Sequence, residues 1–326
     1  MAQVAALTGA SGFLGRRLAS AIRARGWRVR VLVRKAADAA VLARDGFETV
    51  LGDLHDPSAL ATLTADAEVT VNCAGLIKAR DRNAFWAVNQ DGAARLASAA
   101  TGRVVLISSL AAREPQLSDY AASKRAGEEA SRLVAGDRLA IVRPPVIYGP
   151  GDRETLALFR LAGRSPIAPL PARPDARLAL AHVDDVAVAI VDVIERPALA
   201  GVYAVGGARP AGYAWREIID TAWRALGRTV WLTPTPGWAL NLAGALSEAA
   251  GSLAQSPPIF TRGKAREMLH SDWSVSPDEI VPGAPPARFS LEDGFADAVA
   301  WYRATGWLQG AAGGAARLGA AVPRQH

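Results

Sequence analysis

Short apolar segments alternate with longer amphipathic ones over the first half of the chain. Apolar runs occupy residues 4–7, 27–33, 47–51, 68–75, 103–109 and 139–142. Each has the length of a buried strand, and after the first run Leu14, Leu18 and Ile22 recur at helical spacing. Longer helices are predicted over 82–100 and 120–134. Strands alternating with helices in this way predict an α/β fold, a Rossmann-type doubly wound parallel sheet covered on both faces.

The pattern changes after Gly149-Pro150-Gly151. Prolines at 166, 169, 171 and 174 predict an irregular crossing segment, and helices are predicted near 181–195, 213–226, 237–250 and 290–304. A further strand is predicted at 201–205. We therefore expect a first domain of residues 1–150, to which 178–207 return. Residues 151–177 and 208–308 would form a smaller C-terminal substrate-binding lobe, and 309–326 a flexible tail.

Glycines at positions 9, 12 and 15 follow the first predicted strand, and a helix opens at the third. Gly9 permits a tight turn, Gly12 lets the backbone approach a pyrophosphate, and Gly15 allows close packing of helix on sheet. The free N–H groups and the positive end of the helix dipole favour phosphates. Residues 1–150 are therefore predicted to bind a dinucleotide such as NAD(P).

The overall composition excludes several classes of protein. The 326 residues carry a net charge of +6, but the 37 Lys and Arg are scattered singly among 31 acids, which argues against a nucleic-acid partner. Cys73 is the only cysteine, so no intrachain disulfide can form, and no metal site is expected from the spacing of the four histidines. Neither a signal peptide nor an apolar run of ~18 residues is recognisable. We expect a cytoplasmic protein without an integral membrane segment, acting on a small molecule.

Three side chains suit hydride transfer coupled to proton transfer. Tyr120 and Lys124 are four residues apart and share one helix face, and Ser109 ends the preceding strand. A free tyrosine has a pKa of about 10, too high for an efficient base near neutrality. A lysine ammonium ~4 Å away supplies about 4 kcal/mol at an effective dielectric of ~20, which predicts a lowered pKa for the phenol. Ser109 would orient the substrate oxygen.

With these motifs the sequence resembles the extended, two-domain branch of the short-chain dehydrogenase/reductase superfamily, which contains epimerases, dehydratases and dehydrogenases. The matching motifs run in the family's order over residues 1 to about 207. They are Thr8-Gly9-x-x-Gly12-x-x-Gly15, Gly52-Asp53-Leu54, Asn72-Cys73-Ala74-Gly75, Val88-Asn89, Ser108-Ser109, Tyr120-x-x-x-Lys124, the segment 143–151 (Arg-Pro-Pro-Val-Ile-Tyr-Gly-Pro-Gly) and His182-Val183-Asp184-Asp185-Val186.

The resemblance implies roles for individual residues. Tyr120 would be the general acid/base, Lys124 would lower its pKa and bind the nicotinamide ribose, and Ser109, more than Ser108, would hold the substrate oxygen. Asn89 would be a structural or proton-relay residue. Asp53 would receive the adenine amino group, with Leu54 beside the ring. The implied cofactor-binding residues are Gly9, Ser11, Gly12, Phe13, Leu14, Gly15, Arg34, Asp53, Leu54, Cys73, Ala74, Gly75, Tyr120, Lys124, Pro144 and Val146. In the resembled family, homodimers through the helix that carries Tyr120 are common.

Two features bear on cofactor and substrate. Arg34 and Lys35 stand at the end of the second predicted strand, where an acid would bind the ribose 2′-hydroxyl of NAD, so NADP(H) is favoured over NAD(H). Only ten residues separate Ser109 from Tyr120, whereas nucleotide-sugar enzymes of the family resemble one another in a longer insertion there. The favoured function is an NAD(P)-dependent oxidoreductase acting on a hydrophobic secondary alcohol or ketone. The alternatives are a nucleotide-sugar epimerase with tightly bound NAD and a non-catalytic NAD(P)-binding scaffold or assembly protein.

Three other features favour structural interpretations. Cys73 is expected to pack as a small hydrophobe rather than to react. Asp184 is expected to cap the helix that follows it, with His182 packed between domains. An apolar stretch containing Trp238, Leu240, Leu242 and Leu246 is expected to be a plain core helix, and the alternatives are a lipophilic substrate pocket or a membrane contact.

Overall fold

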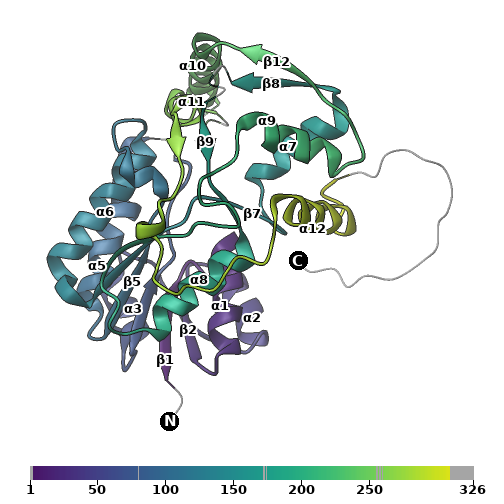
Figure 1. Ribbon diagram of the computed structural model, residues 1–326. Coiled ribbons are helices and arrows are strands. Elements are labelled where there is room, and N and C mark those ends of the chain that lie inside the picture. Colours follow the sequence, from purple (N-terminus) through teal and green to yellow (C-terminus); the bar gives the residue numbers. More distant parts are fainter. Residues whose placement is uncertain are drawn as a thin grey trace.

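The computed structural model describes residues 3–79, 81–171, 173, 175–254, 256, 258 and 260–308. Its centre is a seven-stranded sheet in the order β11-β6-β5-β4-β1-β2-β3, with every neighbouring pair parallel (Figure 1). The strands are β1 (Val4–Thr8), β2 (Arg28–Val33), β3 (Glu48–Leu51), β4 (Val69–Asn72), β5 (Arg103–Ile107), β6 (Leu139–Arg143) and β11 (Gly201–Ala204). The predicted doubly wound α/β sheet is confirmed, and the predicted tail 309–326 lies outside the described residues.

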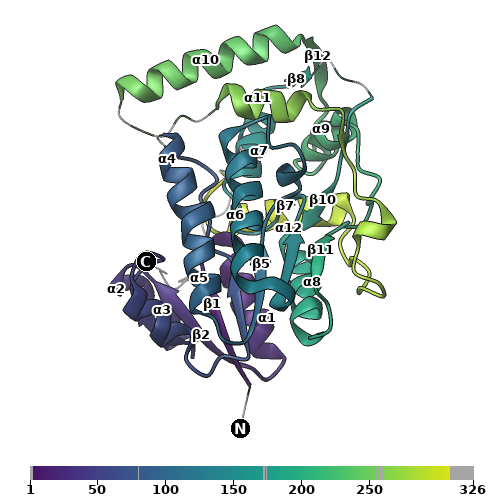
Figure 2. The same cartoon turned by 90° about the vertical axis from the view of Figure 1, so that its left-hand side faces the viewer.

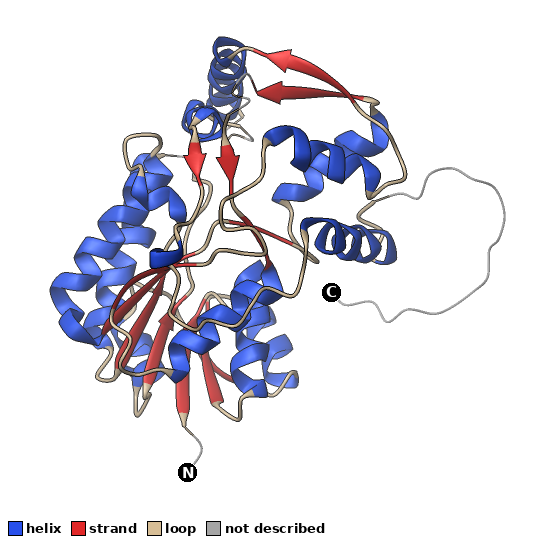
Figure 3. Cartoon of the chain, viewed as in Figure 1, coloured by secondary structure: helices blue, strands red, loops and turns tan. Residues whose placement is uncertain are grey.

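Helices cover both faces of this sheet (Figure 3). On one face α1 (Phe13–Ala24), α2 (Ala36–Arg44) and α8 (Val183–Glu195) share a buried core with the strands. On the other face lie α3 (Pro57–Thr64), α5 (Ala93–Ala99) and α6 (Asp119–Ala135). Burial on both faces explains why the strand sequences are continuous apolar runs rather than alternating ones.

Two strands end earlier than the apolar runs predict. Cys73, Ala74 and Gly75 follow β4 as a loop, and Ser108 and Ser109 leave β5 in the same way. The carboxyl edge of a parallel sheet is where such folds bind ligands. The residues of these motifs are therefore placed at that edge rather than within the sheet.

The helix predicted over 82–100 is present but not uniform. It runs through α4 (Arg82–Phe85), a π-helical segment η1 (Trp86–Gly92) and α5. A π-helical turn inside an α-helix is uncommon and is found frequently at functional sites. Here it contains Asn89, which the resemblance places beside the active-site helix.

The described part of residues 151–177 and 208–308 is called the second lobe below. Most of it lies at the opposite end of the molecule from the N-terminus, and the segment that includes Val281 packs into the core between the sheet and α8 (Figures 1 and 2). The assignment of the second lobe as a separate substrate-binding domain stays a prediction. The helices are α7 (Glu154–Arg164), α9 (Trp215–Arg224), α10 (Gly237–Leu253), α11 (Arg262–Leu269) and α12 (Leu291–Ala304). Its core is aromatic, with Phe159, Trp223, Phe295 and Tyr302 fully buried together with Tyr148.

Three two-stranded parallel pairs accompany these helices. They are β7 (Val146–Tyr148) with β10 (Leu180–His182), β8 (Ile167–Pro171) with β12 (Trp231–Thr235), and β9 (Arg177–Leu178) with β13 (Asp272–Trp273). Short 3₁₀ turns complete the chain: η2 (Leu110–Arg113), η3 (Gly136–Arg138) and η4 (Pro277–Glu279).

The second lobe differs from the sequence prediction at two places. The proline-rich segment is a strand over Ile167–Pro171, because β8 pairs with a single strand and a proline without an N–H is tolerated at such an edge. The helix α10 is present, but Trp238, Leu242 and Leu246 are exposed, so the expectation of a plain core helix is wrong. Among the described residues, no helix is long and apolar enough to cross a membrane.

Candidate active site

The glycine-rich loop joins β1 to α1 with very little free space. Gly9 has a φ of +77°, and a Cβ atom there would lie 2.8 Å from the Ala74 backbone nitrogen. A Cβ on Gly15 would lie 1.9 Å from the Gly9 carbonyl oxygen, so any side chain would push α1 away from the loop. Gly12 is the N-cap of α1 and supplies no side-chain cap. The first N–H groups of the helix can therefore face a phosphate, and the loop fits a dinucleotide pyrophosphate.

The other predicted cofactor residues follow the carboxyl ends of successive strands. Arg34 is exposed directly after β2, and Asp53 and Leu54 follow β3, exposed and buried respectively. The loop after β4 carries Cys73, Ala74 and Gly75, while Pro144 and Val146 lie beyond β6. Ser11, Phe13 and Leu14 belong to the glycine-rich loop and the start of α1. All of them lie along one edge of the sheet, and the order of strands reverses between β1 and β4, where such folds bind dinucleotides.

A hydrogen-bonded pair ties β1 to β4 at that edge, a pair that the sequence analysis did not assign. The Thr8 hydroxyl donates to Asn72 Oδ1 at 2.8 Å and accepts from the Ala74 backbone N–H at 3.1 Å. Both Thr8 and Asn72 are buried. The contact sets the position of the loop after β4 against the glycine-rich loop.

The three predicted catalytic residues come together. Ser118, two residues before Tyr120, caps the N-terminus of α6 by accepting from the Ala121 N–H. Lys124 is buried one turn later, and its Nζ donates to the Ile107 carbonyl oxygen at 2.7 Å. Ser109, partly buried after β5, caps η2 and interacts with the Tyr120 phenol.

The ionisation of these groups differs from the prediction. Burial raises the pKa of Tyr120 to about 12; the Ser109 hydroxyl opposes this shift and the Glu267 carboxylate adds to it. Burial also lowers the pKa of Lys124 to about 8. The predicted lowering of the tyrosine pKa is therefore wrong for the protein chain by itself, because removal from water outweighs the hydrogen bond with Ser109. The phenol carries its proton at neutral pH.

Burial has the same effect on the cysteine at this edge and raises the pKa of the Cys73 thiol to about 12. The side chain packs against the hydrophobic core beneath the sheet edge. A thiol that keeps its proton is a poor nucleophile, which agrees with the interpretation of Cys73 as a packing residue.

Asn89 links three elements around the catalytic helix. Its Oδ1 accepts from the Leu76 N–H at 2.8 Å, and its Nδ2 donates to the Leu76 carbonyl at 3.0 Å and to Ser123 Oγ at 2.9 Å. Leu76 lies in the loop after β4, and Ser123 precedes Lys124 on α6. The amide therefore uses both of its ends to hold the cofactor-side loop against the helix that carries Tyr120 and Lys124.

A buried ion pair lies behind the catalytic residues. Glu128, on α6, accepts from Arg143 Nε at 2.8 Å and Nη2 at 2.5 Å, and from Ser108 Oγ at 2.5 Å. Ser108 is thus occupied by a structural contact, while Ser109 faces the phenol. Sequence reasoning missed Glu128, although the Arg143-Pro144-Pro145 motif marked one of its partners.

The second lobe contributes one buried carboxylate to this region. Ser118 Oγ donates a short hydrogen bond to Glu267 of α11, and Lys264 Nζ lies 3.2 Å from the same carboxylate. Glu267 is one of the charges that raise the pKa of Tyr120. No motif marks Glu267, because its partner Ser118 is 149 residues away in the sequence.

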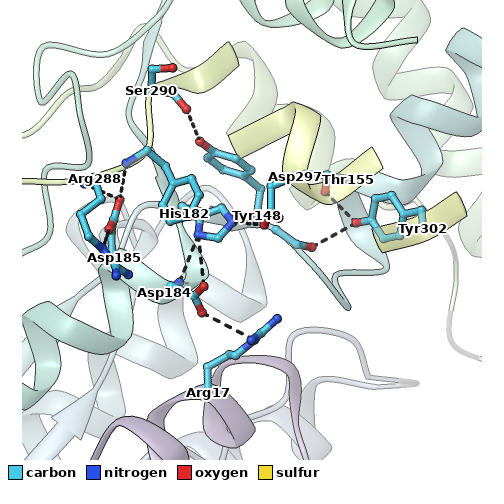
Figure 4. A network of polar contacts seen from close by, with 12 residues as sticks. Arg17, Tyr148, Thr155, His182, Asp184, Asp185, Arg288, Ser290, Asp297 and Tyr302 are labelled. Carbon is cyan, nitrogen blue, oxygen red and sulfur yellow. Dashed lines mark hydrogen bonds and ion pairs between the residues drawn. The ribbon is translucent and has the colours of Figure 1, made fainter. Parts of the chain in front are cut away.

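His182 and the two aspartates after it join the sheet to the second lobe (Figure 4). The His182 ring is buried, stacks on Phe289 with centroids 3.8 Å apart, and approaches Asp297 Oδ2 with Nε2 at 3.2 Å. Its Nδ1 accepts from the Asp184 N–H at 3.3 Å, so His182 caps α8 and the prediction that Asp184 does so is wrong. Burial lowers the pKa of His182, which favours the neutral ring that this cap requires.

The two aspartates have separate partners in this network. Asp184 pairs with Arg17 of α1 at 3.6 Å, and Asp185 accepts from the backbone N–H groups of Arg288 and Phe289 at 3.1 Å each. The motif therefore holds the segment before α12 against the start of α8 (Figure 4). Its role here is structural. Among the described residues, no cluster of three or more His, Cys, Asp or Glu could hold a metal ion.

The model of the NAD dependent epimerase/dehydratase family matches residues 5–206. The chain belongs to this family. A ceramide reductase of Caulobacter vibrioides is 49% identical over 308 residues, which are 94% of this chain and 96% of the relative. The chain is therefore of the nicotinamide-dependent oxidoreductase and epimerase type.

Solved structures agree with this assignment at the level of the fold. The crystal structure of gox2253 superimposes with a TM-score of 0.74 at 24% identity, covering 95% of this chain and all of that one (100%). The UDP-glucose 4-epimerase of Thermus thermophilus in complex with NAD gives a TM-score of 0.67 at 21% identity, with coverages of 92% and 99%.

Proposed function

We propose that this protein is an NADPH-dependent reductase that converts a ketone to a secondary alcohol on a ceramide-class lipid. The observation that carries the reaction type is the convergence of Ser109, Tyr120 and Lys124 at the carboxyl edge of the sheet. The substrate class comes from the ceramide reductase that is 49% identical over nearly the whole of both chains.

The protonation state of Tyr120 is the one that a proton donor needs. A pKa of about 12 keeps the phenol protonated, so it can act as the general acid for a carbonyl oxygen. Bound NADPH would supply the hydride. The carbonyl carbon would take that hydride, the oxygen would take the Tyr120 proton, and Ser109 would hold the oxygen by a hydrogen bond during the transfer.

Lys124 and Arg34 would bind the cofactor at its two ends. An ammonium has three N–H donors, and the Ile107 carbonyl takes one of those on Lys124, which leaves donors for the hydroxyls of the nicotinamide ribose. Arg34 and Lys35 follow β2 at the position where folds of this type bind the adenosine ribose of the cofactor. Two exposed basic groups there suit a 2′-phosphate through charge-assisted hydrogen bonds.

The test uses nucleotide-free protein and a ceramide analogue that carries a ketone. We expect oxidation of NADPH that depends on the ketone, with deuterium from labelled NADPH recovered on the carbinol carbon of the product. NADH should support a lower kcat/KM than NADPH.

Two outcomes would contradict the proposal. Tightly bound NAD in the purified protein, together with interconversion of a nucleotide sugar and no net ketone reduction, would identify an epimerase. A protein that binds neither nucleotide would be a scaffold without turnover.

A further inference from the structure

The helix α10 presents its apolar residues to solvent and its polar ones to the protein. Trp238, Leu242, Leu246 and Leu253 are 70%, 53%, 64% and 88% exposed. The first three are four residues apart and therefore lie on one face of the helix. Large apolar side chains grouped on a water-exposed helix mark an interaction surface more often than chance exposure does.

Two polar residues of α10 face its neighbours instead. Ser247 Oγ accepts from the Phe260 N–H at 3.2 Å. Glu248, the single charged residue within Gly237–Leu253, accepts from the Arg262 N–H at 2.8 Å. The carboxylate thus satisfies the first N–H of α11, next to the Thr261 cap, and the outer face of α10 carries no charge. This orientation is the reverse of that in an ordinary surface helix.

Basic residues lie on the neighbouring helix. Arg262, Lys264 and Arg266 are exposed along α11, which packs against α10. Glu248 pairs with Arg262 at 3.7 Å and Glu267 pairs with Lys264 at 3.2 Å, so three cations and two carboxylates leave the two helices a net charge of +1. An uncharged apolar face on a locally positive pair of helices complements an anionic lipid surface. It suits a second copy of the same face less well, because a two-fold contact would bring the like charges together.

The helix α11 connects α10 to the region of the candidate active site. Glu267 of α11 bonds Ser118, the residue that caps the helix carrying Tyr120. The backbone of α11 and the backbone at the start of α6 are so close that a Cβ on Gly263 would lie 2.8 Å from the Ser118 Cβ. Figure 2 shows α10 as the outermost layer of the molecule, with α11 between it and the rest of the chain.

We propose that α10 binds the surface of an anionic phospholipid bilayer through its exposed apolar face. The helix would lie in the plane of the interface, its tryptophan and leucines inserted at the boundary between headgroups and acyl chains. The active site would then open beside the membrane, from which a long-chain substrate could enter without crossing water. The binding itself does not depend on the proposed reaction.

Flotation with phospholipid vesicles tests this proposal on the full-length protein without cofactor or substrate, so its outcome is separate from that of the proposed function. Vesicles of phosphatidylcholine mixed with phosphatidylglycerol should bind the wild-type protein, and pure phosphatidylcholine or high salt should weaken binding. The double variant Leu242→Glu/Leu246→Glu should bind at least about tenfold more weakly, because two charges replace inserted apolar groups.

The control is Leu133→Glu, which places a charge on a more exposed leucine, in α6. It should bind vesicles as the wild type does. Equal vesicle binding by the double variant and the wild type would overturn the proposal. The proposal would also be overturned if the wild-type protein did not bind vesicles and formed a dimer that the double variant does not form. The helix α10 would then be covered by a second copy of the chain.

Discussion

The helices α6 and α10 both have 17 residues, and they depart from the usual distribution of polarity in opposite directions. The first buries polar groups, Ser123, Lys124, Glu128 and Ser131, against the sheet. The second leaves tryptophan and leucine side chains in water. Burying charge and exposing large apolar groups both reduce stability unless something compensates.

In α6 the compensation is visible within the chain. Lys124 bonds the Ile107 carbonyl and Glu128 bonds Arg143, so these polar groups have partners and are held in place for chemistry. In α10 the carboxylate of Glu248 has a partner on α11, whereas Leu242 and Leu246 stay 53% and 64% exposed. The comparison supports the two proposals made above, a catalytic role for α6 and a contact with an external surface for α10.

The largest expected effect is on the reaction. Tyr120→Phe removes the proton donor and should lower the rate of ketone reduction by about 10²–10⁴-fold, the range for loss of a general acid. Nucleotide binding should persist, measured by NADPH fluorescence. Tyr203→Phe is the control, because that hydroxyl donates only to the nearby Ala200 carbonyl and should not affect the rate. An unchanged rate for Tyr120→Phe would show that another group moves the proton.

The next effect concerns the buried ion pair of α6. Glu128→Ala leaves Arg143 without its carboxylate in a largely buried place and should lower the free energy of unfolding by about 3 kcal/mol. Glu129→Ala, one residue away, breaks an exposed i,i+4 pair with Arg125 and should cost about 0.5 kcal/mol or less. Urea denaturation of both variants measures the difference. Equal losses would mean that the buried pair is no more important than a surface one.

The buried lysine of α6 predicts a pH dependence. Because burial lowers the pKa of Lys124 from 10.5 to about 8, the unfolded chain binds a proton between these pH values that the folded protein has released. The free energy of unfolding therefore gains a contribution that rises with pH across this window, on the order of 3 kcal/mol at ~1.36 kcal/mol per pH unit.

The variant Lys124→Met lacks this titration and isolates it from other groups. The difference in unfolding free energy, wild type minus variant, should increase from pH 8 towards pH 10.5. A constant difference would show that Lys124 keeps an ordinary pKa in the folded protein. Denaturation curves over the pH series provide the measurement.

A smaller effect is expected at the adenosine end of the cofactor site. Arg34→Asp removes a charge-assisted hydrogen bond to a 2′-phosphate and should raise the Kd for NADPH by about 10–100-fold, while that for NADH changes little. Arg44→Asp, at the exposed end of α2, controls for the change in overall charge. Equal weakening of both nucleotides by Arg34→Asp would refute the assigned preference for NADPH.

The smallest expected effect is on the free energy of unfolding, from substitutions on the outer face of α10. Because the outer face of α10 is in water in this protein, Leu242→Gln/Leu246→Gln should change the free energy of unfolding by no more than about 0.5 kcal/mol. A loss of several kcal/mol in urea denaturation would mean that these leucines belong to a core. The same substitutions should still impair vesicle binding.

Much of the sheet and of the catalytic set could be predicted because the information is local. The apolar runs, the glycines at 9, 12 and 15, and the pair Tyr120 and Lys124 depend on spacings of a few residues, and secondary structure converts these into geometry. The same holds for the sheet edge, since residues that end successive parallel strands must meet there.

Other features of the site depend on tertiary contacts, which the spacing of residues along the sequence does not reveal. Glu267 meets Ser118 across 149 residues, and Asp185 meets the Arg288 N–H across 103, so neither partner could be identified along the sequence. The pKa of Tyr120 was predicted in the wrong direction because burial, a property of the whole fold, raises it more than the hydrogen bond with Ser109 lowers it.

The helix α10 shows most clearly which features follow from the sequence and which depend on the tertiary structure. Its sequence determined that the helix has an apolar face and a face with Ser247 and Glu248. Which face of α10 meets water depends on the residues packed against the helix. The first turn of α11 provides the N–H of Arg262, and the Glu248 carboxylate accepts its hydrogen bond. The polar face is therefore turned inward and the leucines outward, and only the packed structure could determine this.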